Sequence, residues 1–124
     1  MFERLWAKRS REQALFALGA VLILVHTVDD SIALGAPDVP PTVITALALL
    51  AAALYPVVGP WWLAGVALFV GVTRLAGGIG HMISLADDPA AGDYTGPSEA
   101  LGAVIVLAIG AAVVRGQVAS RRSA

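Results

Sequence analysis

The segment ALFALGAVLILVHTVDDSIAL, residues 14–34, decides the fold class because it is almost wholly apolar and long enough to cross a membrane. A helix needs roughly 20 such residues to span a hydrocarbon layer of ~30 Å. Three similar segments follow, at about 42–58, 61–85 and 99–115. Backbone groups in lipid must be hydrogen-bonded within their own segment, which favours helices. We therefore predict an all-α integral membrane protein, a bundle of four helices.

Composition supports this class. The chain is 58% hydrophobic and 14% charged, with a mean hydropathy of +0.81, far from an ordinary soluble domain. It contains no cysteine, which excludes disulfides and thiolate metal sites. A net charge of −1 argues against nucleic acid as a partner. The expected surroundings are the lipid bilayer.

Turn-forming and capping residues separate the four segments: Ser10 with Gln13, Pro40-Pro41, Gly59-Pro60 and Gly96-Pro97. Together with the apolar runs they predict helices at about 11–34, 42–58, 61–85 and 98–118. All four fit one domain, residues 1–124. Residues 1–10 place apolar side chains on one face, so we expect a short interfacial helix on the membrane surface.

The distribution of charge predicts the orientation. All the basic residues except Arg74 lie near the two ends of the chain. Five of the nine acids lie in the two loops expected on the opposite side: Asp38, Asp87, Asp88, Asp93 and Glu99. Four crossings put both ends on one side, and the positive-inside rule makes that side the cytoplasm. We therefore expect a multi-pass protein of the cell membrane with cytoplasmic N and C termini.

Five ionisable residues lie within the apolar segments: His26, Asp29, Asp30, Arg74 and His81. Ionisable groups at membrane depth mark either a functional site or an internal ion pair. At 1.5 Å per residue from the inner helix ends, His26 lies at ~18 Å, Arg74 at ~20 Å, Asp30 at ~24 Å and His81 at ~30 Å. The residues therefore predict one polar pocket in the outer half of the bilayer.

Two further observations define this pocket. His26 and Asp30 are four residues apart and share a helix face, and Arg74 and His81 are seven apart and share another. Glu99 opens the fourth helix on the outer side, where it can close the pocket.

The polar residues allow several interpretations. Arg74 can form an ion pair with Asp29 or Asp30 that serves only the structure. Alternatively, His26, Asp30 and His81 can hold a transition-metal ion with two nitrogens and one oxygen. Haem is disfavoured, because the two histidines differ in expected depth by ~12 Å. The first choice is a binding or accessory protein for an ion, a polar ligand or a partner protein.

Two alternatives remain open. Pairs of small residues at four-residue spacing, such as Ala67 with Gly71, suit a homodimer that transports protons or a small solute. A small membrane enzyme is the other alternative, with His26 as a base oriented by Asp30, although the sequence has no recognised nucleophile or cofactor motif.

The motifs VHTVDDS, residues 25–31, and GDYTG, residues 92–96, give the chain a resemblance. It resembles, over about residues 14–115, the helical membrane region that precedes an α/β-hydrolase domain in some bacterial proteins, which pairs an HxxDD motif with a DYTG motif. No hydrolase domain is expected in these residues, so hydrolysis is not implied. The resemblance implies a separately encoded partner and a joint role at the outer surface for five residues: His26, Asp29, Asp30, Asp93 and Tyr94.

Overall fold

The computed structural model describes residues 2–34, 39–88 and 95–123, with side chains for 11–29, 32, 42–54, 59–88 and 95–122. The described chain forms four helices: α1 (Phe2–Leu34), α2 (Val39–Val58), α3 (Pro60–Asp87) and α4 (Gly96–Ser123). This is the all-α four-helix fold that the apolar segments predict.

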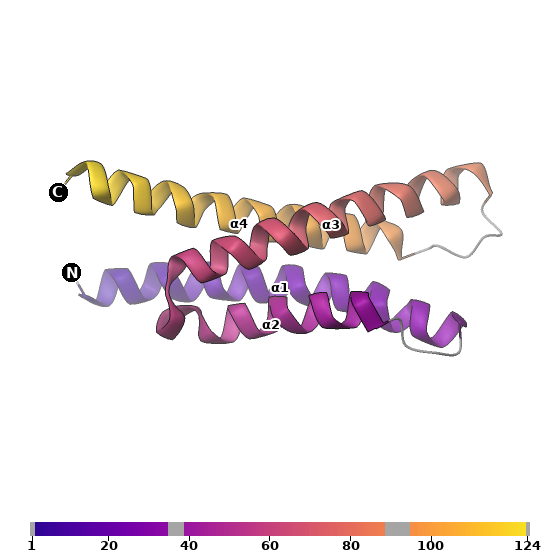
Figure 1. Ribbon diagram of the computed structural model, residues 1–124, viewed down its shortest axis with the longest axis horizontal. Helices are drawn as coiled ribbons and strands as arrows, with labels where there is room; N and C mark the ends of the chain where they lie inside the picture. Colours follow the sequence, from indigo (N-terminus) through magenta and orange to yellow (C-terminus); the bar gives the residue numbers. More distant parts are fainter. Residues whose placement is uncertain (1, 35–38, 89–94, 124) are drawn as a thin grey trace.

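The helices form a ring in which each packs against its neighbours in the sequence and α4 closes the ring against α1. α1 and α2 lie side by side, and α3 crosses them obliquely before it meets α4 (Figure 1). α1 begins and α4 ends at the same end of the bundle (Figure 1). We call this the terminal end, and the other the loop end.

Helix starts follow from the prolines and a glycine. Pro60 opens α3 at a position where its missing N–H is not needed, as the sequence predicts. Gly59, between α2 and α3, has φ of 97°, a left-handed conformation that suits glycine. α2 begins at Val39, before the predicted 42, because Pro40 and Pro41 occupy its first turn, where proline is tolerated.

α1 is longer than predicted. It runs without a break from Phe2, so the expected boundary between residues 10 and 11 is not a helix boundary. Its 33 residues correspond to ~50 Å, well beyond a hydrocarbon layer of ~30 Å. That residues 1–10 lie on a membrane surface stays a prediction.

Three helices have spans that are long and apolar enough to cross a membrane: Arg11–Asp29, Pro60–Asp87 and Gly96–Arg122. The described apolar part of α2, Thr42–Leu54, is shorter. These findings fit a multi-pass membrane protein. Large apolar side chains point outward, Ile32, Leu68 and Phe69 among them, as expected of helices that face lipid.

Small residues bring the helices together. Gly19 of α1 and Gly102 of α4 face each other so closely that a Cβ on Gly19 would lie 2.9 Å from the Gly102 carbonyl oxygen. Ala67 of α3 packs on Gly110 of α4 in the same way. Ala67 therefore serves a contact within the chain. The close approach of α4 to both α1 and α3 places the polar residues of these helices within hydrogen-bonding distance.

Candidate functional site

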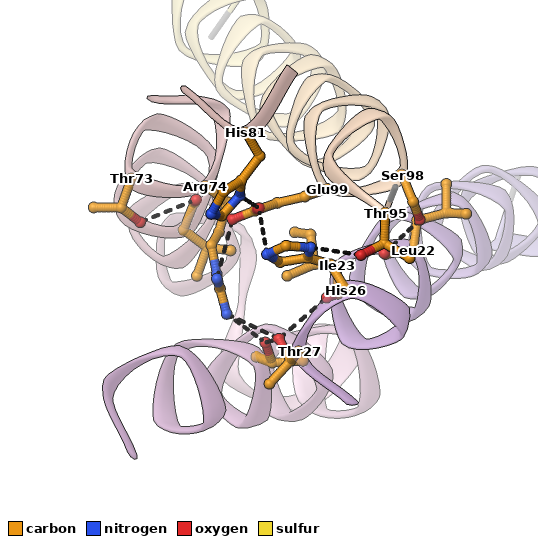
Figure 2. Close-up of polar contacts among 12 residues, drawn as sticks. Leu22, Ile23, His26, Thr27, Thr73, Arg74, His81, Thr95, Ser98 and Glu99 are labelled. Carbon is orange, nitrogen blue, oxygen red and sulfur yellow. Dashed lines mark hydrogen bonds and ion pairs between the residues drawn. The ribbon is translucent and has the colours of Figure 1, made fainter. Parts of the chain in front are cut away.

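The Glu99 carboxylate is the centre of a polar cluster near the loop end of the bundle (Figure 2). Its Oε2 atom lies 3.0 Å from Nε2 of His26 on α1 and 3.0 Å from Nδ1 of His81 on α3. The two imidazole rings are stacked obliquely, with centroids 4.5 Å apart. Glu99 and His26 are almost fully buried, whereas the His81 side chain is 32% exposed. The cluster therefore reaches the surface through His81.

Arg74 of α3 binds the other side of the carboxylate. Its Nη1 donates to Oε1 of Glu99 at 3.1 Å. Its Nη2 donates to the hydroxyl of Thr27 on α1 at 3.0 Å and to that of Thr45 on α2 at 3.3 Å. Figure 2 shows the guanidinium extending from Glu99 toward Thr27. Through Arg74 and Glu99 the site contains residues from all four helices.

His26 is held from its other ring nitrogen. Its Nδ1 lies 2.8 Å from the Thr95 hydroxyl oxygen, and that hydroxyl donates to Oδ2 of Asp29 at 3.0 Å. Thr95 directly precedes α4, so its hydroxyl is fixed by the start of that helix. The result is a hydrogen-bonded chain that runs from Asp29 through Thr95 and His26 to Glu99.

The protons in this chain can be counted. The single hydroxyl proton of Thr95 goes to Asp29, so the Thr95 oxygen accepts from Nδ1–H of His26. A neutral imidazole with its proton on Nδ1 has a lone pair at Nε2, and this atom faces the Glu99 oxygen. Two lone pairs would repel each other at 3.0 Å. A cation, either a proton or a metal ion, must therefore lie between His26 and Glu99.

The formal charges of the described cluster are compatible with an added cation. With both imidazoles neutral, the cluster contains the carboxylates of Asp29 and Glu99 and one guanidinium, that of Arg74. Arg74 pairs with Glu99, so the uncompensated charge is that of Asp29, whose side chain is only half-buried. One additional positive charge would make the formal charge of these residues neutral.

Glycine makes room for the cluster. A Cβ on Gly77 of α3 would lie 2.9 Å from Oε1 of Glu99, and one on Gly96 of α4 would lie 2.8 Å from Cβ of His81. The absence of side chains at these two positions lets the carboxylate and the second imidazole take their places. The first turn of α4 also favours an acid at Glu99, because helix N-termini stabilise negative charge.

The structure brings together the five singled-out residues whose side chains it describes: His26, Asp29, Arg74, His81 and Glu99. The side chains of Asp30, Asp93 and Tyr94 lie outside the described residues, so their roles stay predictions. The ion pair observed for Arg74 is with Glu99, whereas the sequence suggested Asp29 or Asp30. Among the described residues, the side chains that could hold a metal ion are those of His26, His81 and Glu99. The sequence predicted Asp30 as the carboxylate ligand of this set.

The expected difference in depth between His26 and His81 is wrong, because their rings are in contact. The depth estimate from the sequence assumed that residue 14 of α1 and Trp61 of α3 lie at the same depth in the membrane. Gln13 instead donates to the carbonyl of Ala53, five residues before the end of α2 at Val58, so α3 starts ~8 Å lower than assumed. Depth is therefore no argument against haem.

The hydroxyl groups of Thr27, Thr45 and Thr95 complete the site. Sequence reasoning expected a structural hydrogen bond from Thr27, but it missed Thr45 and Thr95. Thr27 and Thr45 are buried, and their hydroxyls lie 3.4 Å apart. Threonine within an apolar helix is common and usually bonds its own backbone, as Thr27 does with Ile23.

Comparisons of the chain with protein-family models, with curated proteins and with solved structures gave no significant match.

Proposed function

We propose that this protein binds a divalent transition-metal ion of the zinc class, with His26, His81 and Glu99 as ligands. The observation that carries the proposal is the convergence of three ligand atoms, all within 4.8 Å of one another. Two imidazole nitrogens and one carboxylate oxygen form a donor set typical of zinc sites that keep a position open for water or substrate.

The distances support this assignment. Ligands at ~2.0–2.1 Å from a tetrahedral ion lie about 3.3 Å apart. Each imidazole nitrogen is now 3.0 Å from the Glu99 oxygen, so these two spacings would lengthen by only a few tenths of an ångström around an ion. The ligand atoms of the two imidazoles lie within 4.8 Å of each other. The same ion would supply the positive charge that the proton count requires between His26 and Glu99.

The surrounding hydrogen bonds also suit a metal site. Metal-binding histidines usually donate their other N–H to an oxygen, and ligating carboxylates are themselves hydrogen-bonded. The Thr95 hydroxyl oxygen is the acceptor for the second ring nitrogen of His26, and Arg74 is the hydrogen-bond donor to Glu99. Both ligands are therefore held in a fixed orientation before an ion arrives.

A binding role fits the bundle better than transport. From Arg74 toward the terminal end, the described core is apolar, with Leu63, Val66 and Val113 as examples. A path for protons through this core would need polar groups or water. We place the site on the outer side of the cell membrane, because the basic ends of the chain favour cytoplasmic termini.

The test is metal analysis of the purified protein, produced without a polyhistidine tag. His26 and His81 are the only histidines in the chain, so other strong nitrogen sites are excluded. We expect one Zn²⁺ per chain, and Co²⁺ in its place should give the visible absorption of a tetrahedral site. His81→Gln should lower the affinity for Zn²⁺ by at least about 10-fold.

The partial exposure of His81 makes its replacement tolerable for folding. Asp87→Asn is the matched control, because Asp87 is an exposed acid near the same end of α3. Absence of a stoichiometric ion, or equal affinity in wild type and His81→Gln, would overturn the proposal. The cluster would then be an ion-pair network closed by a proton.

A further inference from the structure

A second feature lies away from the polar cluster, in an apolar groove between α3 and α4. The groove has a volume of about 580 Å³ and includes Trp61, Gly65 and Leu68 on one wall and Gly110 and Arg115 on the other. On α3 it extends from Trp61 to Leu68, whereas the cluster lies at Arg74 and beyond. It is therefore open to lipid along the half of the bundle nearer the terminal end.

Small residues shape the floor of this groove. Gly110 of α4 packs directly on Ala67 of α3, which brings the two helices close together at the base. Gly65 has open space around it, since a Cβ there would meet no atom within 4 Å. The groove is thus a trough with an almost entirely apolar lining, which an extended alkyl chain can fill.

Positive charge stands at one end of the trough. Among the described residues that line it, Arg115 alone is charged, and its side chain is exposed. The Arg121 guanidinium lies 5.2 Å from the centre of the Trp61 ring, which lines the same end. Glu12 and Arg115 both line a neighbouring hollow. Arg115 therefore lies between Glu12 and the trough.

From this arrangement we infer that the groove holds an anionic phospholipid of the bilayer, with an acyl chain along the trough and the headgroup phosphate at Arg115 and Arg121. Arginine is well suited to phosphate, because its guanidinium donates several hydrogen bonds in a plane. Tryptophan at the same level matches the interface where headgroups lie.

Charge complementarity favours a lipid over a second copy of the chain. In a dimer whose two-fold axis is parallel to the bilayer normal, the same surface of each copy lies at the interface. Arg115 would then face Arg115, and like charges at one contact are unfavourable. An anionic headgroup compensates the same guanidinium. This inference is independent of the proposed metal site.

The experiment is native mass spectrometry of the protein released from nanodiscs made of equal amounts of phosphatidylglycerol and phosphatidylcholine. We expect the wild type to retain phosphatidylglycerol preferentially. A basic residue near an anionic lipid surface contributes ~1 kcal/mol, so Arg115→Gln should reduce that preference about fivefold. Arg122→Gln is the matched control, with the same loss of charge two helix turns further along α4.

A second pair of variants tests the trough itself. Gly65→Leu fills it, whereas Gly80→Leu places the same side chain on α3 where nothing lies within 4 Å. We expect Gly65→Leu to reduce retention of both lipids and Gly80→Leu to leave it unchanged. Equal retention in both members of each pair would overturn the inference. It would also be overturned by a dimer mass that Gly65→Leu abolishes, because a second copy would then occupy the groove.

Discussion

Arg74 and Glu99 form a buried ion pair that joins α3 to α4, with Nη1 and Oε1 3.1 Å apart. The arginine is 6% exposed and the glutamate 1% exposed. Each charge is therefore compensated inside the protein rather than by solvent. Breaking such a pair on one side leaves a buried charge alone, which costs far more than the pair contributes.

Replacement of Arg74 should therefore destabilise the protein strongly. We expect Arg74→Met to lower the free energy of unfolding by about 3–5 kcal/mol, measured by denaturation in detergent micelles. Arg122→Met, which removes an exposed arginine, should change it by less than about 0.5 kcal/mol. A small effect of Arg74→Met would mean that Glu99 does not depend on this arginine.

A double variant measures the interaction energy between Arg74 and Glu99, apart from the effect of each single replacement. Glu99→Gln alone should also be destabilising, because the Arg74 guanidinium then lacks its carboxylate. In Arg74→Met/Glu99→Gln no buried charge of the pair is left, so the loss should be smaller than the sum of the single losses by about 1–3 kcal/mol. Additive losses would contradict direct coupling between the two residues.

Thr45 connects α2 to the cluster through Arg74 and Thr27. Thr45→Val keeps the shape but removes the hydroxyl, and hydrogen bonds between membrane helices contribute about 0.6–1.7 kcal/mol. We expect a loss of that size in unfolding measurements. Thr73→Val is the comparison, because within the described residues the Thr73 hydroxyl bonds only to carbonyls of its own helix, those of Phe69 and Val70. An equal loss in both variants would show that Thr45 adds nothing across helices.

Gly78 and Gly80 should respond in opposite directions to alanine. A Cβ on Gly78 would lie 2.7 Å from the backbone nitrogen of Ala100, so Gly78→Ala must push α3 and α4 apart. Around Gly80 nothing lies within 4 Å, and alanine in a helix gains about 1 kcal/mol over glycine. Thermal unfolding should show a lower midpoint for Gly78→Ala and an equal or higher one for Gly80→Ala.

Thr95 is expected to act on the metal site without touching the ion. Thr95→Val removes the oxygen that holds Nδ1 of His26, and loss of such a contact typically lowers metal affinity 10–100-fold. Ser98→Ala removes a comparable bond from α4 to α1, between Ser98 and the Leu22 carbonyl, but away from the ligands. Zinc titration should distinguish the two variants. Equal affinities would exclude Thr95 as the residue that orients His26.

The sequence predicted the helices well because length and apolar composition determine them in lipid. It also indicated a polar pocket, since His26, Arg74 and His81 stand out against apolar neighbours. The pairing within the pocket depends on how far one helix is displaced along another. Periodicity does not give that displacement; here the Gln13 contact with Ala53 reveals it.

Hydroxyl groups posed a different difficulty. Thr45 lies in an ordinary apolar segment, between Ile44 and Ala46, whereas the exposed Thr73 directly precedes Arg74. The neighbours in the sequence therefore point to the wrong threonine. Its role arises only because α2 packs where the Arg74 guanidinium extends. Contacts of this kind depend on tertiary packing, which a single sequence without homologues does not specify.

The contribution of residues from all four helices to the cluster has a consequence for biogenesis. Ribosomes deliver α1, α2 and α3 to the membrane before α4, so the arginine is inserted before the glutamate that neutralises it. Until α4 follows, the Arg74 guanidinium lacks the Glu99 carboxylate, although the hydroxyls of Thr27 and Thr45 on α1 and α2 are present to accept its hydrogen bonds. The ion pair therefore forms only when α4 joins the other three helices, so it marks the complete assembly of the four-helix bundle.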